Sequence, residues 1–509
     1  MKHPAYLGTG IIILLFLIAC RHQPEPATPS PAFWGKVGSS AIQVPSIDSV
    51  LNNTDDQVEN TTFSEQEVRI TFDGSLVSIN NPWSDNGVQT LCTDGHVTCI
   101  TTAEERIVYR IGGTGTGSVK IYSDKKVKVI LDQLHLTNTD GPAISLQGKK
   151  RQFLVLEGDN SLVGEGVQTT NHDKDNEQAK GTLFAEGKVI VSGEGSLAIT
   201  SNKRHALASD DYVRIRSGVI QINTYDSPSA SDGIHTKEGF VMESGALTIQ
   251  ARDEGIQAGD SVHPAFCYIA GGEIAITTDT GDGIRASQKV TVSGGNIRVH
   301  SQNNEGIESK GSLLVTDGDI EVNAWNDAFN AEEGIYIHGG RTYAHSIDND
   351  ALDSNQNIVI EGGLVVAISG YNPETALDAD LGELIITGGT ILGIGSQSVM
   401  FVYPSAKSQQ YSIWTSVMSD TSYNLQNSTY TDAMNFYIPP TAYDPYILLS
   451  SPYLTEGDNF LIAHAEILGG DNWHGLYLGA AHNGDRPRSR VTAAKYGTPF
   501  PSNWGTKQP

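Results

Sequence analysis

Acidic side chains recur at one position of a repeated tripeptide, and they are the residues of this sequence best suited to chemistry. The tripeptide reads acid-Gly-Ile in four copies and Asp-Ala-Phe or Asp-Ala-Leu in two later ones, beginning at Asp232, Glu254, Asp282, Glu305, Asp327 and Asp350. If the copies stack about 4.8 Å apart, neighbouring carboxylates repel by about 1 kcal/mol in water and several-fold more in a partly buried site. Either their pKa values rise or a cation bridges them. For the first four copies we expect turn acids that point into solvent, because Asp caps its own backbone at turns.

The last copies differ, because acids and amides accumulate on both sides of the turn. Oxygen donors from adjacent loops, with no His or Cys among them, suit Ca²⁺, which takes six to eight hard ligands in flexible geometry. The sequence therefore predicts at least one Ca²⁺ site, with ligands among Asp327, Asp348, Asp350, Asp353, Asp378 and Asp380.

The elements that must position these acids belong to a longer repeat, which is marked by turn glycines. Between Gly272 and Gly363 the glycines are 23, 23, 22 and 23 residues apart. Two and four residues after each glycine the side chain is mostly aliphatic, and the residue between is polar until the last repeats. This alternation indicates a strand with one buried face, and an apolar pair before each glycine indicates a second such strand. A period of about 23 residues without a helical segment predicts an all-β fold, a parallel β-helix of about 22–28 residues per rung.

The chain divides into five predicted segments. Residues 1–20 have a charged start, a short apolar run and Leu17-Ile18-Ala19-Cys20, which resembles the bacterial lipobox; the alternative is an ordinary signal peptide. We expect Cys20 to be lipidated, so that the exported protein is anchored in the bacterial cell envelope without a spanning helix. Residues 21–60 are predicted to be a flexible linker, 61–400 the β-helix with an N-terminal cap, 401–480 a small C-terminal β module that covers its last edge, and 481–509 an irregular tail.

The net charge limits the classes of partner that the protein can bind, and the cysteine content limits its redox chemistry. With 33 basic and 59 acidic residues the net charge is −26, which argues against nucleic acid and an anionic membrane face and favours cations. Cys92 and Cys99 flank a hairpin-like segment, and export permits a disulfide between them; a metal pair is less favoured because no further Cys lies near. Cys267 falls in an inward column, where we expect a small buried hydrophobe rather than a nucleophile.

Several segments resemble the bacterial carbohydrate-binding proteins first described from a cellulolytic clostridium. They include Asn326-Asp327-Ala328, Asn349 to Asn355, Thr375-Ala376-Leu377-Asp378 and Thr387 to Gly393, and the resemblance spans roughly Val68 to Ala463. It implies a right-handed parallel β-helix similar to pectate lyases, Ca²⁺ in the helix, and binding of cellulose-like or acidic plant polysaccharides. The Asp-Ala-Phe and Asp-Ala-Leu tripeptides depart from the more usual Asp-Gly-Ile of that family.

A sugar chain along such a solenoid would be held by outward aromatic and polar side chains. By strand parity the candidates are Trp325, Tyr343, Tyr336, Arg341, His345 and Asn323, although each could also be a surface residue that covers its neighbours. We therefore expect a monomeric protein that binds polysaccharide with the help of Ca²⁺ and has no catalytic activity. The alternatives are a structural or adhesive solenoid, and a polysaccharide lyase in which a cation acidifies the proton that a base removes. The basic residues near the turn columns, Lys237, Arg285, Lys310 and Arg341, lie in no recognisable catalytic motif.

Overall fold

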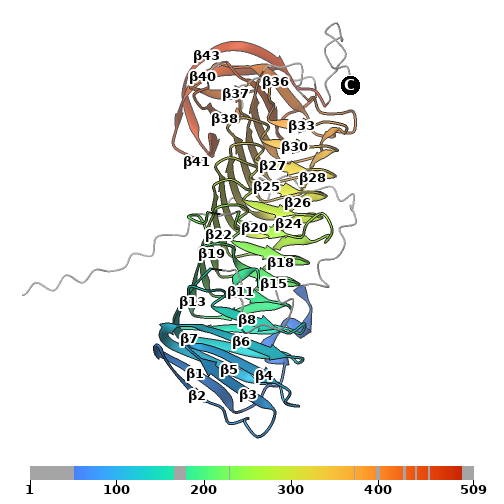
Figure 1. Cartoon of the computed structure of the whole chain (residues 1–509). Helices are drawn as coiled ribbons and strands as arrows, with labels where there is room; N and C mark the ends of the chain where they lie inside the picture. The colour runs from blue at the N-terminus through green and yellow to red at the C-terminus, as the bar shows by residue number, and fades with distance from the viewer. Residues whose placement is uncertain are drawn as a thin grey trace, which may run out of the picture.

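The chain forms a long solenoid of stacked rungs with a small antiparallel sheet at one end (Figure 1). The computed structural model describes residues 51–165, 179–228, 230–371, 373–396, 402–427, 432–441, 444–456 and 459–495. The predicted signal peptide with Cys20, residues 21–50 of the predicted linker and residues 496–509 lie outside the described residues. Within the described ranges, no helix is long and apolar enough to cross a bilayer.

Each rung has three faces, which we number in chain order. The first face leads into the glycine turn, with strands β9 (Gln152–Glu157), β12 (Val189–Gly193), β15 (Tyr212–Ile215), β18 (Gly239–Met242), β21 (Phe266–Ile269), β28 (Gly334–Ile337), β31 (Ile358–Ile360) and β34 (Leu384–Ile386). The second face follows the turn, with β10 (Asp159–Gly164), β13 (Ser196–Ser201), β16 (Val219–Asn223), β19 (Ala246–Ala251), β22 (Glu273–Thr278), β29 (Arg341–Ser346), β32 (Leu364–Ile368) and β35 (Thr390–Gly395). Five strands run through the turn and join both faces into one sheet: β1 (Glu67–Gly74), β5 (Val108–Thr116), β7 (Val127–Asn138), β24 (Lys289–Ser301) and β26 (Ser312–Ala324).

The third face is a separate 13-stranded sheet that carries the repeated tripeptide. It consists of β3 (Val88–Thr93), β4 (His96–Thr101), β6 (Ser118–Ser123), β8 (Ile144–Gln147), β11 (Gly181–Ala185), β14 (His205–Ser209), β17 (Ile234–Thr236), β20 (Ile256–Ala258), β23 (Ile284–Ala286), β25 (Ile307–Ser309), β27 (Phe329–Ala331), β30 (Leu352–Ser354) and β33 (Leu377–Ala379). At the N-terminal end both sheets finish in antiparallel hairpins, β1 with β2 (Leu76–Asn80) and β3 with β4. These hairpins cover the open end of the stack.

Neighbouring rungs pair in parallel and in register, which confirms the predicted parallel β-helix. On the second face Ile274 lies opposite Ile297, which lies opposite Ile320, and all three are buried in one continuous core. The turn glycines allow this stacking, because Gly295 and Gly318 have φ values of +96° and +120°, a region that side chains with a Cβ rarely adopt.

The tripeptide needs glycine in the middle rungs because its backbone passes close to side chains of the second face. A Cβ on Gly306 would lie 2.1 Å from Cγ1 of Val322, and a Cβ on Gly283 would lie 2.1 Å from Cγ1 of Val299. In the next two rungs the tripeptide carries Ala328 and Ala351, and the corresponding second-face positions are Ala344 and Ala367. The change from Asp-Gly to Asp-Ala is therefore accompanied by a change from Val to Ala, which leaves room for the extra methyl group.

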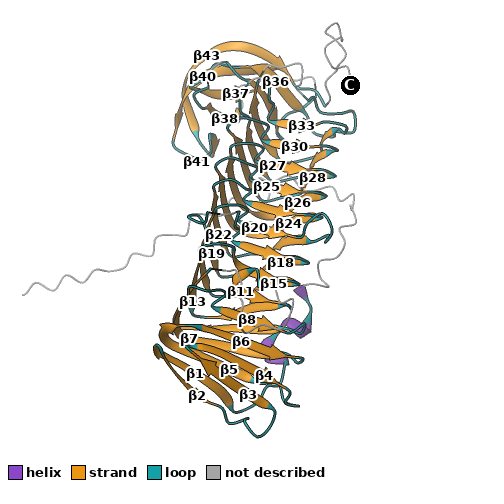
Figure 2. Cartoon of the chain, viewed as in Figure 1, coloured by secondary structure: helices purple, strands orange, loops and turns teal. Residues whose placement is uncertain are grey.

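The predicted flexible linker is wrong for its last ten residues. Two short 3₁₀ helices, η2 (Thr54–Asp56) and η3 (Val58–Asn60), lie against the first face of the lower rungs (Figure 2). Asp56 is fully buried, and its carboxylate accepts hydrogen bonds from Arg151 Nε at 2.5 Å and from Arg214 Nη1 at 2.8 Å. Proline and polar residues suggested a tether, but these long-range ion pairs fix residues 51–60 to the solenoid.

At the C-terminal end two strands extend the main sheet with antiparallel pairing, β39 (Tyr446–Ser450) against β35 and β36 (Ser412–Ser416) against β39. A six-stranded antiparallel sheet then packs on the outer side of the second face. Its strands are β37 (Thr421–Gln426), β38 (Asp432–Ile438), β40 (Asn459–Leu468), β41 (Asp471–Trp473), β42 (Leu476–Leu478) and β43 (Ala481–Thr492). The predicted irregular tail is therefore wrong for residues 481–492, because β43 pairs along the whole of β40. The alternating pattern that would have predicted this strand is interrupted by Gly484, Pro487 and several arginines.

The predicted disulfide does not form in this structure. Cys92 and Cys99 lie on the hairpin strands β3 and β4, but Cys92 is opposite Val97 and Cys99 is opposite Thr90. This register offsets the two cysteines along the strands, with Cys92 exposed and Cys99 buried, so the sequence proximity was misleading. Cys267 is buried in the core as expected, and burial raises the pKa of its thiol to about 12.

Candidate functional site

The repeated acids form a column at the corner between the second and third faces. Backbone hydrogen bonds connect each tripeptide to the next, for example from Gly306 N to the carbonyl of Asp327 and from Gly233 N to that of Glu254, both at 2.9 Å. We call this set the turn column: His205, Asp232, Glu254, Asp282, Glu305, Asp327, Asp350 and Thr375. Three residues later in each rung lies a second set on the third face, the strand column: Ala208, His235, Gln257, Arg285, Glu308, Asn330, Asp353 and Asp378.

The expectation that the first acids point into solvent is wrong. Asp232 is 1% exposed, Glu254 is 8% exposed and Asp282 is fully buried. Because each turn lies directly on the next, a short side chain at this position packs between two turns instead of extending outward. Burial and the nearby Glu308 and Glu305 carboxylates raise the pKa of Asp282 to about 10.

Basic side chains compensate the acids in the lower and middle rungs. In the middle of the stack Arg285 lies 3.4 Å from Glu254, 3.1 Å from Glu308 and 3.8 Å from Asp282. Lys310 reaches Glu308 at 2.5 Å. These contacts make this part of the corner a ladder of ion pairs.

In the upper rungs an amide and backbone N–H groups hold the acids instead. Asn330 Nδ2 donates to Oδ2 of Asp327 at 3.0 Å and to Oδ2 of Asp353 at 3.1 Å. The backbone amide of Asp350 donates to Oδ1 of Asp327 at 3.0 Å, and that of Thr375 donates to Oδ1 of Asp350 at 2.6 Å. The donors orient the carboxylates without adding a full positive charge.

Three of the six predicted metal ligands converge here. One carboxylate oxygen from each of Asp350, Asp353 and Asp378 lies within 4.8 Å of the others. Burial raises the pKa of Asp350 to about 8 and that of Asp353 to about 7, and the neighbouring carboxylates add to both increases. This crowding of buried carboxylates is the arrangement that a divalent cation relieves.

The other predicted ligands lie beside this cluster. Asp327 is one rung below, and burial raises its pKa to about 7, although the hydrogen bonds from Asn330 and from the Asp350 amide oppose the increase. Asp348 lies in the loop before the turn column, and Asp380 directly follows β33 at the other end of the third face; both side chains are exposed and stand outside the group of three.

The predicted sugar-binding residues do not form one cluster. Trp325 is 44% exposed at the corner, two residues before Asp327. Tyr336 lies on the first face, on β28, away from the corner. Asn323 and His345 lie on adjacent rungs of the second face, where their side chains are in hydrogen-bonding contact at 3.2 Å.

The remaining two predicted contacts lie against the C-terminal sheet, although the side chain of Arg341 stays 43% exposed. The ring of Tyr343 stacks on His474, with centroids 3.7 Å apart and an interplanar angle of 15°, and burial raises the pKa of Tyr343 to about 12. Arg341 pairs with Asp319 and lies over the ring of Trp473 at 5.8 Å. The alternation of side chains along the strand correctly predicted that both residues point outward from the solenoid. The hairpin of β41 and β42, however, packs on that surface.

Sequence reasoning missed Tyr371, which is 58% exposed on the same corner as Trp325. The two lie in equivalent loops two rungs apart, because the amide of Asp348 donates to the carbonyl of Trp325 and the amide of Gly370 donates to that of Asn349. The loop of Tyr371 is longer than the equivalent loops of the rungs directly below it, so a search by fixed spacing from the glycines does not reach it.

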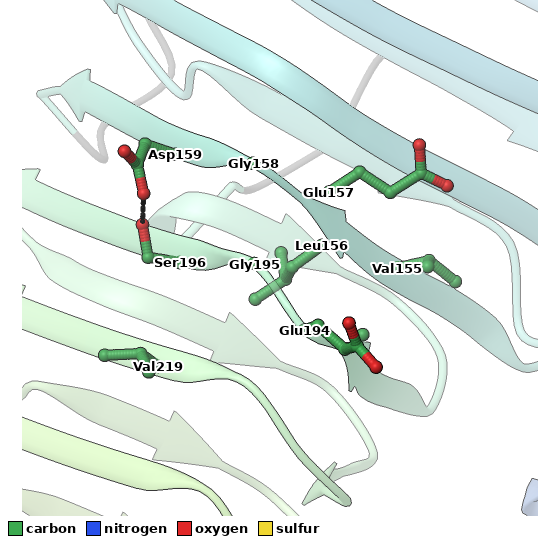
Figure 3. Close-up of a pocket in the computed structure, with 10 residues that line it drawn as sticks. Val155, Leu156, Glu157, Gly158, Asp159, Glu194, Gly195, Ser196 and Val219 are labelled. Atoms are coloured by element: carbon green, nitrogen blue, oxygen red, sulfur yellow. Dashed lines mark hydrogen bonds between the residues drawn. The ribbon is translucent and has the colours of Figure 1, made fainter.

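An open hollow of about 650 Å³ lies over the glycine turns of the lower rungs (Figure 3). Gly158, Gly193 and Gly195 line it together with Leu156 and Val219. It exists because the glycines have no side chains. Its acids, Glu157, Asp159 and Glu194, are spread around the rim, and Asp159 accepts a hydrogen bond from Ser196. It lacks the convergent carboxylates that mark the corner.

These features define a parallel β-helix with a column of buried acids along one corner. The chain matches the family model described as "Carbohydrate-binding domain-containing protein" over residues 94–348 and 298–426, which together cover more than half of the sequence. It therefore belongs to this carbohydrate-binding family. Among solved structures it is similar to the polysaccharide lyase-like protein from C. thermocellum, determined as a gadolinium derivative, with 19% sequence identity and a TM-score of 0.42 over 49% of this chain and 97% of that one. No curated protein sequence matches it.

Proposed function

We propose that this protein binds an extended polysaccharide non-catalytically, along the corner between its second and third faces, with the help of a divalent cation such as Ca²⁺. The observation that carries the proposal is that three convergent carboxylates, one buried and two half-buried, and two exposed aromatic side chains lie at the same corner of neighbouring rungs. Membership of a carbohydrate-binding family supports a glycan as the partner.

The residues at the corner fit a hard cation. Asp350, Asp353 and Asp378 would hold it through carboxylate oxygens, and Ca²⁺ commonly takes six to eight oxygen ligands. Three carboxylates leave coordination positions for water and for sugar oxygens. When bound, the ion would neutralise the crowded carboxylates and offer a positive charge to an acidic sugar.

The aromatic side chains provide surfaces for pyranose rings. Trp325 and Tyr371 lie two rungs apart, about 10 Å along the axis, which is about the length of two residues in an extended β-linked glycan. Aromatic rings present an apolar face that can pack on the C–H groups of a sugar. A neutral glucan needs only this stacking, whereas an acidic glycan needs the cation because the net charge of −26 repels it.

The ion pairs at the corner make its basic side chains unsuitable as the general base of a lyase. A general base works best with a pKa near the operating pH. Hydrogen bonds and charges from nearby carboxylates instead raise the pKa values of Lys237, Arg285 and Lys310, so these side chains stay protonated.

We further propose that the protein works at the bacterial cell surface, lipid-anchored through Cys20. The segment 51–60 would then attach the tether to the first face of the lower rungs, whereas the proposed binding corner joins the second and third faces.

The test is retention of the full-length chain, purified in detergent, on insoluble cellulose and on polygalacturonate, with added CaCl₂ and with EDTA. We expect Trp325→Ala to weaken binding about tenfold, which corresponds to about 1.4 kcal/mol. The matched control is Tyr453→Ala, since Tyr453 is a similarly exposed aromatic residue, 47% exposed, in the C-terminal region.

Three outcomes would contradict the proposal. Failure to bind either polymer at any Ca²⁺ concentration would favour a structural or adhesive solenoid. Equal losses in the Trp325 and Tyr453 variants would place binding elsewhere. A chelator-sensitive rise in absorbance from unsaturated sugar product would identify a lyase.

A further inference from the structure

A second group of metal-ligating side chains lies lower on the same corner, and nothing in the proposed function uses it. His205 begins β14 and occupies the turn column directly below Asp232, because the amide of Ala206 donates to the carbonyl of Asp232. His235 lies on β17, in the strand column. From Asp232 to Asp350 there are five rungs, about 24 Å, so this group is separate from the upper acids.

The three side chains converge on one point. Oδ2 of Asp232 lies 3.2 Å from Nδ1 of His205 and 2.7 Å from Nδ1 of His235. The two imidazole rings stack with centroids 4.2 Å apart and an interplanar angle of 17°. One donor atom from each residue lies within 4.8 Å of the other two. Zn²⁺ binds His nitrogen at about 2.0–2.1 Å and carboxylate oxygen at about 2.0–2.2 Å, so ligand atoms around a tetrahedral ion stand about 3.3 Å apart. The contact to His235 must lengthen by about half an ångström, and the two stacked rings must tilt so that each nitrogen points at the ion.

The lone pairs on His205 Nδ1 and Asp232 Oδ2 also favour a positive charge at this position. Nδ1 of His205 accepts a hydrogen bond from the backbone amide of Asp232 at 3.1 Å, so in this tautomer it carries a lone pair. Oδ2 of Asp232 lies 3.2 Å from the same nitrogen, which places two electron-rich atoms opposite each other. A proton on this nitrogen, or a metal ion that takes the place of the amide hydrogen bond, would remove the repulsion.

A fourth ligand stands one rung above. Asp232, Asp253 and Glu254 also bring carboxylate oxygens within 4.8 Å of one another. Glu254 is 8% exposed and also lies 3.4 Å from Arg285, so a metal ion would share its carboxylate with this ion pair.

We propose that His205, Asp232 and His235 bind a divalent transition-metal ion of the Zn²⁺ type, with Glu254 as the fourth ligand. Imidazole nitrogen selects Zn²⁺, Cu²⁺, Ni²⁺ or Fe²⁺ over Ca²⁺, whereas the upper group offers oxygen alone. The exposed fractions of the His205 and His235 side chains are 12% and 18%, so an ion can reach the site from solvent while most of its shell is protein. The corner thus carries two cation sites of different chemistry.

The test uses the full-length chain in detergent, stripped of metal with EDTA and then held in excess CaCl₂ to occupy oxygen-only sites. Calorimetric titration with ZnCl₂ at pH 7.5 should give one site per chain. The double variant His205→Gln/His235→Gln should weaken Zn²⁺ binding about 100-fold or more, and Asp350→Asn should leave it unchanged. Binding should also weaken at pH 5.5, because metal ligation requires neutral imidazole.

A spectroscopic measurement on the wild-type chain tests the proposal independently of whether the variants fold. Co²⁺ in the site should give the visible absorption of a four-coordinate ion, and one equivalent of Zn²⁺ should abolish it. The proposal is overturned if wild-type protein shows neither Co²⁺ absorption nor Zn²⁺ binding under excess Ca²⁺. It is equally overturned if the double variant folds and binds Zn²⁺ as tightly as the wild type. Neither result bears on polysaccharide retention, which depends on the upper rungs.

Discussion

At the scale of single residues, position within the stack decides what an identical acid does. Asp282 is buried beside Arg285, whereas Asp350 is buried against Asp353 and Asp378. Both occupy the same place in the repeated tripeptide. The residue three positions later in the same rung, Arg285 or Asp353, therefore determines whether the acid lies beside a positive charge or in a candidate cation site.

The upper acids predict a pH-dependent effect of Ca²⁺ on stability. The pKa values of Asp327, Asp350 and Asp353 are raised to about 7, 8 and 7, above the unfolded value of about 4. Between pH 4 and 8 the cation-free folded state therefore holds more protons than the unfolded state, and the free energy of unfolding falls as pH rises. Ca²⁺ competes with these protons, so it should raise the melting temperature more at pH 8 than at pH 5. At 100 times Kd, binding adds about 2.7 kcal/mol.

Differential scanning calorimetry with CaCl₂ or EDTA at the two pH values measures this difference. Asp350→Asn should abolish the Ca²⁺ effect, and Asp348→Asn, an exposed acid in the same turn, should retain it. An equal Ca²⁺ shift at both pH values would show that these carboxylates are not the ligands.

A second prediction concerns Asp56 in the N-terminal segment. Asp56→Ala removes one of the two carboxylate partners of Arg214, which is 1% exposed, and breaking a buried pair costs about 3–5 kcal/mol. The control Asp55→Ala removes a carboxylate that is 62% exposed and should cost less than about 1 kcal/mol. Denaturant unfolding measures both, and similar losses would mean that the segment is not held by its buried ion pairs.

At the scale of elements, the third-face strands are positioned by how closely the tripeptide approaches the second face. Where the second face carries Val299 and Val322, the tripeptide carries glycine; where it carries Ala344 and Ala367, the tripeptide carries alanine. The Asp-Ala variants are thus a packing adjustment. They leave the acids of the upper rungs in the same column.

This complementarity predicts non-additive stability changes. Gly306→Ala should destabilise by about 1–3 kcal/mol, because its Cβ meets Val322 Cγ1 and the carbonyl oxygen of Ala328. In the double variant with Val322→Ala, the loss should be smaller than the sum of the single losses by about 0.5–3 kcal/mol. Urea unfolding of the four proteins completes the cycle, and strictly additive losses would refute the packing explanation.

At the scale of the whole molecule, the two ends of the solenoid are finished differently. Antiparallel hairpins cover the N-terminal end, whereas at the C-terminal end β36 and β39 extend the main sheet and the six-stranded sheet covers the outer side of the last rungs (Figure 1). That outer side is apolar in the upper rungs, where it carries Leu364, Val366 and Leu392, all buried under the sheet. The cap and the upper rungs therefore share a second core.

Truncation after Ser396 should expose this second core and the unpaired edge of β35, and the shortened protein should aggregate. Truncation after Lys495 keeps all of β43 and should have no such effect. Size-exclusion chromatography with light scattering distinguishes the two, and a soluble monomer ending at Ser396 would argue against the capping role.

The sequence predicted the parallel β-helix because its period and its inward columns are local patterns that repeat. It also placed Asp350, Asp353 and Asp378 together, because in-register stacking converts a fixed spacing into spatial contact. It failed wherever the partner was distant in sequence. Tyr343 is covered by His474, and Asp56 is buried by Arg214.

What the sequence determined by itself is the repeating frame, since hydrophobic alternation and turn glycines act over a few residues. What only the tertiary structure decided is the environment of each acid and aromatic side chain. Solvent exposure and charge compensation depend on the rung above, the rung below and the sheet that packs outside. For this reason His205, which no motif marks, lies against Asp232 and His235, while Tyr343 lies under the C-terminal sheet.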